Sequence, residues 1–309
     1  MISNKSRGSA LLTALFIMTL VAIIMTAMTA FVRQNIYQTV LGVSYTQNVA
    51  DLDVVNAWAM NYLQDKNHDL NHLKKGKVAR LPKSLQGFIP GVKLEGEIID
   101  GQSKFNLNNL QDNMYFSIFV HLIKNTLPSL SEKHVVYIVG ATHLWIMAYQ
   151  PGRGADDLVK YYLSQHPPYS MSHQPMRQIS EFRLIFNVDK AIYDTLTPYL
   201  IVLPEKAPIN LYTARKALLK SLGNNLTSTQ LSRLLQTRQD TSLPNKIKMM
   251  QLIKQFNIPP AQVSLSSDYF LVKAKITTDA MSLSSDTLYK REVDKKKHLT
   301  LKLISRNFY

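Results

Sequence analysis

The chain has 309 residues, and its 36 lysines and arginines against 21 aspartates and glutamates give a formal charge of +15 at pH 7. Hydrophobic residues make up 46% of the sequence, which excludes a disordered chain and allows one large domain or two of ordinary size. There is no cysteine, which excludes disulfides, cysteine-ligated metal sites and cysteine nucleophiles. The positive charge is compatible with an anionic partner and equally with a role in solubility, so it does not distinguish between the two.

The first 32 residues have the composition of a leader followed by a membrane span. Residues 1–8 are polar and carry Lys5 and Arg7, whereas the 24 residues 9–32 hold no charge. In a helix that stretch is roughly 36 Å long, which exceeds the ~30 Å hydrocarbon core of a bilayer. We therefore expect residues 9–32 to cross a membrane once, with the basic leader in the cytoplasm and the rest on the far side.

Helical spacing continues beyond this span. Apolar residues recur at steps of three and four up to Tyr62, and no proline precedes Pro82. We predict one helix from about residue 9 to residue 65, on the order of 85 Å long, whose second half packs under a globular head. A cleaved secretory signal peptide is the alternative, and it predicts a mature start near residue 30.

Alternating sequences predict the strands of a small sheet. Residues 92–98, 270–276 and 299–303 place apolar side chains on one face and lysine, glutamate or threonine on the other, which is typical of half-buried strands. The basic stretch 74–83 contains glycine and proline and predicts a loop, while the charged stretch 290–297 predicts the solvated end of a hairpin.

The middle of the chain shows helical spacing punctuated by prolines, with expected helices at 115–126, 132–148, 180–186, 190–196, 214–222, 229–238 and 246–256. Strands flank this region on both sides. We therefore expect an α+β fold: a long N-terminal transmembrane helix packed on a small antiparallel sheet, with a large all-helical domain inserted between strands. The expected divisions are the leader, the transmembrane part, the remaining helix with the first strands, the inserted domain and the C-terminal strands, at residues 1–8, 9–32, 33–104, 105–262 and 263–309.

Gly8, the small Ser9 and the apolar helix that follows them resemble the type IV prepilin signal. In proteins with that signal, a membrane-bound prepilin peptidase cuts the leader on the cytoplasmic side after the glycine, and the apolar helix stays in the membrane. The resemblance implies that Gly8 and Ser9 form the processing site.

Thr13 occupies the fifth mature position, where major pilins carry a glutamate. A carboxylate inside a bilayer needs a cationic partner, and in pilin filaments this is the N-terminal amine of the neighbouring subunit. A subunit with Thr13 lacks that docking contact but can still receive it from another subunit, so we expect it at an end of the stack. The simpler interpretation is an ordinary helix threonine that bonds back to a helix carbonyl.

Residues 100–110 (DGQSKFNLNNL) are similar to the D-x-Q-G-x-F-N-L-N-N-L segment of the general secretion pathway protein K family, the large minor pseudopilins of type II secretion. Further landmarks of that family appear in order at residues 167–169, 179–184, 203–214, 267–272 and 305–306. We expect four polar residues of these segments to serve the fold as caps or turn residues, namely Asn106, Asn108, Ser180 and Asn210.

This resemblance implies a minor pseudopilin that caps the pseudopilus tip and nucleates assembly with other minor pseudopilins. Its implied partners are those minor pseudopilins, the major pseudopilin, the inner-membrane assembly platform and the prepilin peptidase. The implied location is the bacterial inner membrane, with a single pass and the head in the periplasm. We expect no enzymatic activity, because the sequence contains no G-x-S-x-G, P-loop, G-x-G-x-x-G or H-E-x-x-H motif.

The family resemblance also raises calcium binding, but this chain departs from the pattern. Family members often carry an acidic D-W-x-D-x-D run, whereas residues 143–148 contain Trp145 and no carboxylate. Asp156 and Asp157 remain as candidate calcium ligands. Calcium prefers roughly six to eight oxygen ligands, so we expect a poor calcium site at most and no other cofactor.

Two other functions remain open. A minor pilin of a type IV pilus or DNA-uptake apparatus would share the leader and the helix, and the positive charge would suit DNA. Nucleic-acid binding needs basic residues focused on one face, whereas lysine and arginine are scattered along this sequence, which disfavours it. A secreted helical binding protein with a cleaved signal peptide would instead be a soluble product.

Overall fold

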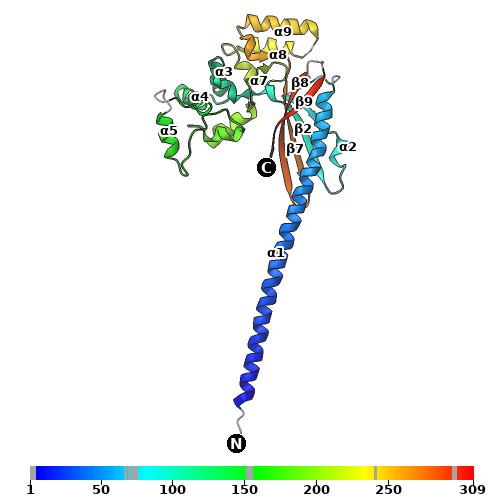
Figure 1. Cartoon of the computed structure of the whole chain (residues 1–309). Helices are drawn as coiled ribbons and strands as arrows, with labels where there is room; N and C mark the ends of the chain where they lie inside the picture. Colours follow the sequence, from blue (N-terminus) through cyan, green and yellow to red (C-terminus); the bar gives the residue numbers. More distant parts are fainter. Residues whose placement is uncertain are drawn as a thin grey trace.

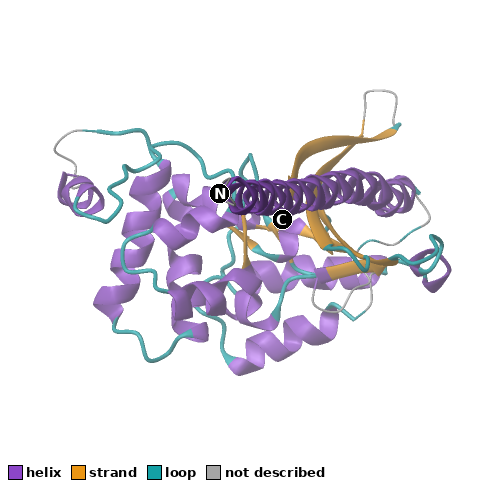
Figure 2. Cartoon of the chain, turned by 90° about the horizontal axis from the view of Figure 1, so that it is seen from below, coloured by secondary structure: helices purple, strands orange, loops and turns teal. Residues whose placement is uncertain are grey.

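The computed structural model describes residues 5–65, 68, 70, 76–150, 156–239, 242–293 and 298–309. One long helix projects from a head in which a sheet lies beside a group of helices (Figure 1). Seen from below, the helices gather on one side of the long helix and the strands lie next to it (Figure 2). Parts of three sequence predictions fall outside the described residues: 1–4 of the leader, 74–75 of the loop and 294–297 of the hairpin end.

The long helix, α1 (Lys5–Gln64), is continuous over 60 residues, which confirms the single helix predicted from the spacing. At 1.5 Å per residue it is about 90 Å long. Every side chain of residues 9–40 is exposed, and burial begins only beyond them. From there a stripe at steps of three and four residues is fully buried in the head, formed by Leu52, Val55, Ala59 and Leu63.

Five antiparallel strands form the sheet, in the order β1-β2-β7-β8-β9. Their bounds are β1 Lys77–Arg80, β2 Lys93–Asp100, β7 Tyr269–Thr277, β8 Ser282–Val293 and β9 Leu299–Phe308, and the short α2 (Lys83–Gln86) connects β1 to β2. The apolar face predicted for β2 and β7, with Leu94, Ile98 and Val272, packs on the buried stripe of α1. A Cβ atom on Gly96 of β2 would lie 2.5 Å from a methyl group of Val55, so glycine permits this close approach of helix and sheet.

The structure corrects three details of the sheet. Part of the predicted loop at 74–83 is strand β1, because it pairs with β2. Strand β8 includes Lys290–Val293, which the sequence analysis assigned to a solvated hairpin end. Leu303, predicted on the inner face of β9, is 54% exposed on this strand at the edge of the sheet.

The region between β2 and β7 is mostly helical. Its helices are α3 (Phe116–Thr126), α4 (Glu132–Ile146), α5 (Asp156–Leu163), α6 (Lys190–Leu196), α7 (Lys216–Lys220), α8 (Ser228–Thr237) and α9 (Leu243–Gln255). Its 3-10 turns are η2 (Gly101–Ser103), η3 (Leu107–Gln111), η4 (Asn113–Tyr115), η5 (Ile179–Leu184), η6 (Thr197–Tyr199) and η7 (Pro260–Gln262). A large apolar cluster, from Phe105 to Val263 in sequence, forms a core distinct from the core between α1 and the sheet.

The α+β fold, with its long apolar helix and antiparallel sheet, is as predicted, but the inserted region is not entirely helical. Two-residue parallel pairs join β3 (Phe105–Asn106) to β4 (Leu200–Ile201) and β5 (Ile209–Asn210) to β6 (Val263–Ser264). The helix expected at 180–186 is the 3-10 turn η5, and α5 was not predicted. The division of the chain into separate domains stays a prediction.

Candidate functional site

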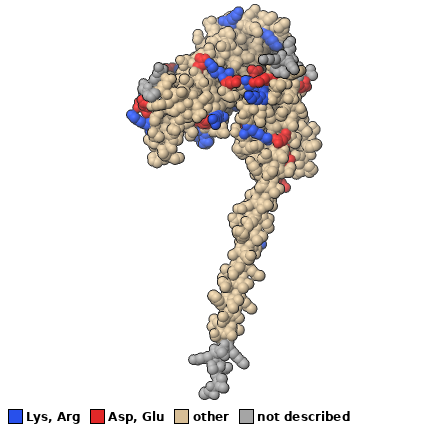
Figure 3. All heavy atoms as spheres, viewed as in Figure 1, with Lys and Arg blue, Asp and Glu red and all other residues tan. Residues whose placement is uncertain are grey.

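The first half of α1 exposes apolar side chains on all sides. Leu11, Phe16 and Phe31 are between 65% and 76% exposed. Within the described part of the chain, Ser9–Gln64 is the one helix long and apolar enough to cross a membrane. The shaft below the head is almost free of charge (Figure 3). Because the head covers none of this surface, it is compatible with contact to lipid or to other apolar helices.

The predicted processing and placement residues lie at the start of this shaft. Gly8 and Ser9 are both part of the α1 helix, and the Ser9 side chain is exposed. The Thr13 hydroxyl donates a hydrogen bond of 2.6 Å to the backbone carbonyl of Ser9. Thr13 is therefore satisfied within its own helix turn and presents no charge. Roles in cleavage and end placement stay predictions for these residues.

A buried polar cluster joins the end of β2 to distant parts of the inserted region. Asp100 is fully buried, and one of its carboxylate oxygens accepts hydrogen bonds from the Asn210 amide at 3.0 Å, the Ser267 hydroxyl at 2.7 Å and the Thr213 hydroxyl. Its other oxygen accepts from the backbone N–H of Gln102 at 2.8 Å. Burial raises the pKa of Asp100, while these hydrogen bonds oppose the rise. The cluster ties the beginning of the insertion to its later segments.

The asparagines of residues 100–110 continue this connection. The Asn108 amide donates to the carbonyls of Met176 at 3.0 Å and Leu203 at 2.9 Å, and the Asn109 amide donates to that of Ala207 at 2.8 Å. The Asn106 side chain caps η3 by accepting from the N–H of Asn108. Since buried polar groups need partners, these residues hold the fold together.

Asn210 also serves as predicted, since its side chain accepts from the backbone N–H of Tyr212 at 3.0 Å. Ser180 does not act as a cap in the structure. Its hydroxyl donates to the side chain of Gln178 at 3.3 Å, and the N–H groups at the start of η5 are met by Glu181 instead.

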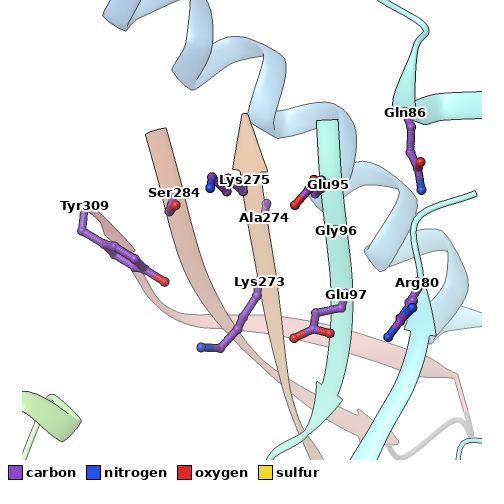
Figure 4. A pocket seen from close by; sticks show the side chains of 10 residues that line it. All are labelled: Arg80, Gln86, Glu95, Gly96, Glu97, Lys273, Ala274, Lys275, Ser284 and Tyr309. Carbon is purple, nitrogen blue, oxygen red and sulfur yellow. The ribbon is translucent and has the colours of Figure 1, made fainter. Parts of the chain in front are cut away.

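The sheet face opposite α1 carries a charged groove of about 500 Å³ (Figure 4). Glu95 and Glu97 of β2 lie opposite Lys275 and Lys273 of β7, so positive and negative side chains alternate across it. Lys93 lies 2.7 Å from Glu95 and lowers the pKa of that carboxyl group. The groove is an open polar surface, in contrast to the apolar face under α1.

Asp156 and Asp157 lie in the first turn of α5. Asp156 accepts a hydrogen bond of 3.0 Å from the Tyr149 hydroxyl, and the side chain of Asp157 is 98% exposed. Among the described residues there is no group of three or more His, Cys, Asp or Glu side chains that could hold a metal ion. A calcium role for Asp156 and Asp157 stays a prediction.

Several known proteins are similar to this chain over part of its length. The family model described as "Type II secretion system (T2SS), protein K" matches residues 103–205. The type II secretion system protein K of Pectobacterium carotovorum subsp. carotovorum is 27% identical over 216 residues, which are 61% of this chain and 63% of the relative. That of Klebsiella pneumoniae is 31% identical over 160 residues, which are 47% of this chain and 48% of the relative. Over these ranges the chain is similar to type II secretion system protein K.

The alignments with these two relatives span 63% and 48% of their lengths, so the match is to part of each relative. A solved structure from enterotoxigenic Escherichia coli, titled as the GspK–GspI–GspJ complex of its type 2 secretion system, contains a chain with the same fold. The TM-score is 0.59 at 18% identity, over 89% of this chain and 98% of that one. This likeness supports the fold described above.

Sequence reasoning did not find the role of Asp100. The partners Asn210, Thr213 and Ser267 lie more than 100 positions away, so no local spacing connects them. The signal that could have found the cluster is the set of family landmarks, since residues 100–110, 203–214 and 267–272 each supply part of it.

Proposed function

We propose that this protein is a minor pseudopilin of a type II secretion system that caps the pseudopilus tip and nucleates its assembly. One observation carries the proposal. The first half of α1 is apolar on every side and none of it is buried by the head, so it is suited to lie in a membrane and then against other such helices. Similarity to type II secretion system protein K supports the same role.

In this proposal α1 anchors the chain in the bacterial inner membrane with a single pass, and the head lies in the periplasm. The prepilin peptidase cuts between Gly8 and Ser9 and removes Lys5 and Arg7 with the leader. Ser9 then becomes the first residue of a helix that remains in the membrane until the subunit enters the pseudopilus.

The proposed partners are other minor pseudopilins, the major pseudopilin and the inner-membrane assembly platform. The similar solved structure is titled as a complex of three such proteins, which supports the first of these partners. The protein acts by its position in the assembly and not by catalysis. Helix α1 packs against the helices of the other subunits, and the head terminates the stack of subunits.

Two features support placement at the tip. Thr13 carries no charge to bind the N-terminal amine of a neighbouring subunit, and its hydroxyl is already bonded to Ser9. In addition, helices α3 to α9 extend the head well to one side of α1 (Figure 2). Such a head is easier to accommodate at an end than within a closely packed shaft.

Mass spectrometry of the mature N-terminus, with protein from native membranes of strains with and without the prepilin peptidase, tests the class. We expect a start at Ser9 that disappears in the strain without the peptidase. A start near residue 30, or an intact Met1 in both strains, would remove the pseudopilin proposal.

Tip placement is tested by the ratio of this chain to the major pseudopilin in sheared pseudopili sorted by length. An end subunit predicts a ratio that falls as the fibres lengthen. We expect Thr13→Glu to raise the ratio, because it restores the missing docking carboxylate, and Thr13→Val to leave it unchanged. A wild-type ratio independent of fibre length would contradict tip placement.

A further inference from the structure

A second cavity, of about 420 Å³, lies where the sheet meets the inserted helices. Strands β1, β2 and β7 contribute Lys77, Glu97 and Lys273 to its lining. The inserted region contributes Lys104 and Arg215, from the segments before β3 and α7. This cavity shares Glu97 and Lys273 with the groove on the outer face of the sheet (Figure 4).

Positive charge exceeds negative charge in this cavity. The Lys77 ammonium is paired with Glu97 at 2.5 Å, and Lys273 lies 3.6 Å from Asp286 outside the cavity lining. The other carboxylate of the lining, Asp194, is engaged by Lys190 at 2.5 Å.

Two cations of the lining are therefore left over. Within the described residues neither Lys104 nor Arg215 forms an ion pair. Arg215 only places its guanidinium over the ring of Tyr199, at 5.5 Å from the centroid.

The environment of Lys104 disfavours its charged form. Its side chain is half-buried. Burial first, and then the nearby charges of Lys273 and Arg215, lower the pKa of Lys104 to about 8, and the carboxylates of Asp286 and Glu97 offset only part of this shift. A desolvated cation beside like charges is costly unless an anion balances it. The surroundings therefore favour a further negative group, beyond the carboxylates that the described residues supply.

We propose that this cavity binds an oxyanion, a phosphate or a carboxylate, between Lys104, Arg215 and Lys273. The planar guanidinium of Arg215 suits two oxygens at once, and the lysines add point charges. Since Lys273 belongs to the sheet and the other two belong to the inserted region, the bound anion braces one part of the head against the other. A free ion and an acidic side chain of a neighbouring subunit would use the same chemistry.

Thermal unfolding of the full chain in detergent tests the site, with inorganic phosphate, acetate and sodium chloride compared at equal ionic strength. Near ten times the Kd we expect phosphate or acetate to raise Tm by about 2–4 °C above chloride. Stabilisation by phosphate alone identifies a phosphate-type site, and stabilisation by acetate alone identifies a carboxylate subsite for an acidic side chain. Equal Tm values in all three salts would overturn the proposal.

Lys104→Met and Arg215→Met should lose this shift, whereas Lys216→Met, a change to an exposed lysine next to Arg215, should keep it. Because Lys104→Met removes an unbalanced charge, we expect it to fold at least as well as wild type without the anion. A Lys104→Met protein that gains as much from the anion as wild type would contradict the assignment.

Amine labelling of the wild-type chain gives a second test that needs no variant. At pH 8, where much of Lys104 is deprotonated, an amine-reactive reagent should modify it readily, and peptide mass spectrometry follows the rate. We expect phosphate to slow labelling of Lys104 several-fold and to leave Lys216 unaffected. Equal slowing at both lysines would indicate a general salt effect and refute the site.

Discussion

The first half of α1 and the turn at residues 100–110 are opposites in composition and surroundings. The helix is apolar and fully exposed, with no contact to its own head, whereas the turn is polar and almost completely buried. In the turn, Asp100 and the asparagines find hydrogen-bond partners far away in the sequence. The segment with the clearest family motif thus maintains the fold, whereas the segment that carries the proposed function depends mainly on its length and apolar character.

Replacing Asp100 removes the centre of the polar turn and has the largest expected effect on stability. Asp100→Ala leaves the buried donors of Asn210, Thr213 and Gln102, and the partly buried hydroxyl of Ser267, without their acceptor. We expect a loss of about 3–5 kcal/mol in the free energy of unfolding. Urea unfolding of the full chain in detergent, followed by tryptophan fluorescence, measures it.

The matched control is Asp157→Ala, because that carboxylate is almost fully exposed. We expect it to change stability by less than about 0.5 kcal/mol. If Asp100→Ala stayed within 1 kcal/mol of Asp157→Ala, on the order of a single ordinary hydrogen bond, the cluster would not be the connection described here.

A charge placed in the middle of the apolar first half of α1 tests the other region of this comparison. Leu20 lies near the centre of residues 9–32, and arginine there costs about 3 kcal/mol relative to leucine on membrane insertion. We expect Leu20→Arg to reduce the fraction that resists alkaline carbonate extraction and to abolish pseudopilus assembly. The head should resist protease as in wild type, because it does not touch Leu20.

Leu20→Phe is the control for this experiment, since it keeps the position apolar. It should extract and assemble like the wild-type chain. Normal assembly of Leu20→Arg would show that the shaft does not enter lipid or a helix bundle at this depth.

The same contrast explains what the sequence could predict. The continuous α1, strands β2 and β7 and most helices follow from local periodicity, which one segment carries alone. Strand β8 has mixed polar and apolar residues, and it is a strand because β7 and β9 pair with it on both sides. The cavity around Lys104 and the cluster around Asp100 combine segments far apart in sequence, so only the tertiary structure brings them together.

Lys104 is an intermediate case, a half-buried charged group that forms no ion pair with the residues that the structure describes. Its pKa of about 8 lies below the ordinary value of 10.5, so the folded state loses this proton at lower pH than the unfolded state. The resulting destabilisation is complete below pH 8 and fades as the pH rises to about 10.5. In phosphate-free buffer at pH 7 we expect the free energy of unfolding of Lys104→Met to exceed that of wild type by on the order of 1 kcal/mol, after allowance for solvent screening.

This difference should shrink steadily between pH 8 and pH 10.5, measured as the gap between the two urea-unfolding curves at each pH. Lys216→Met serves as the reference, because its exposed side chain should show no such trend. A gap that is constant with pH would mean that Lys104 keeps an ordinary pKa in the folded protein.

The smallest effect is expected at Thr13, which like Thr19 and Thr26 bonds its hydroxyl back to a carbonyl of the same helix. Thr13→Val keeps the shape of the side chain and removes only its hydrogen bond to the Ser9 carbonyl. That carbonyl keeps its place as an acceptor in the backbone hydrogen bonds of the helix. We expect a change of a few tenths of a kcal/mol at most and unaltered membrane extraction, processing and pseudopilus assembly. Thr13 then matters because it is not glutamate, and the hydroxyl itself contributes nothing between subunits. Loss of assembly in Thr13→Val, with processing at Ser9 intact, would reverse that conclusion and make the hydroxyl a contact with a neighbouring helix.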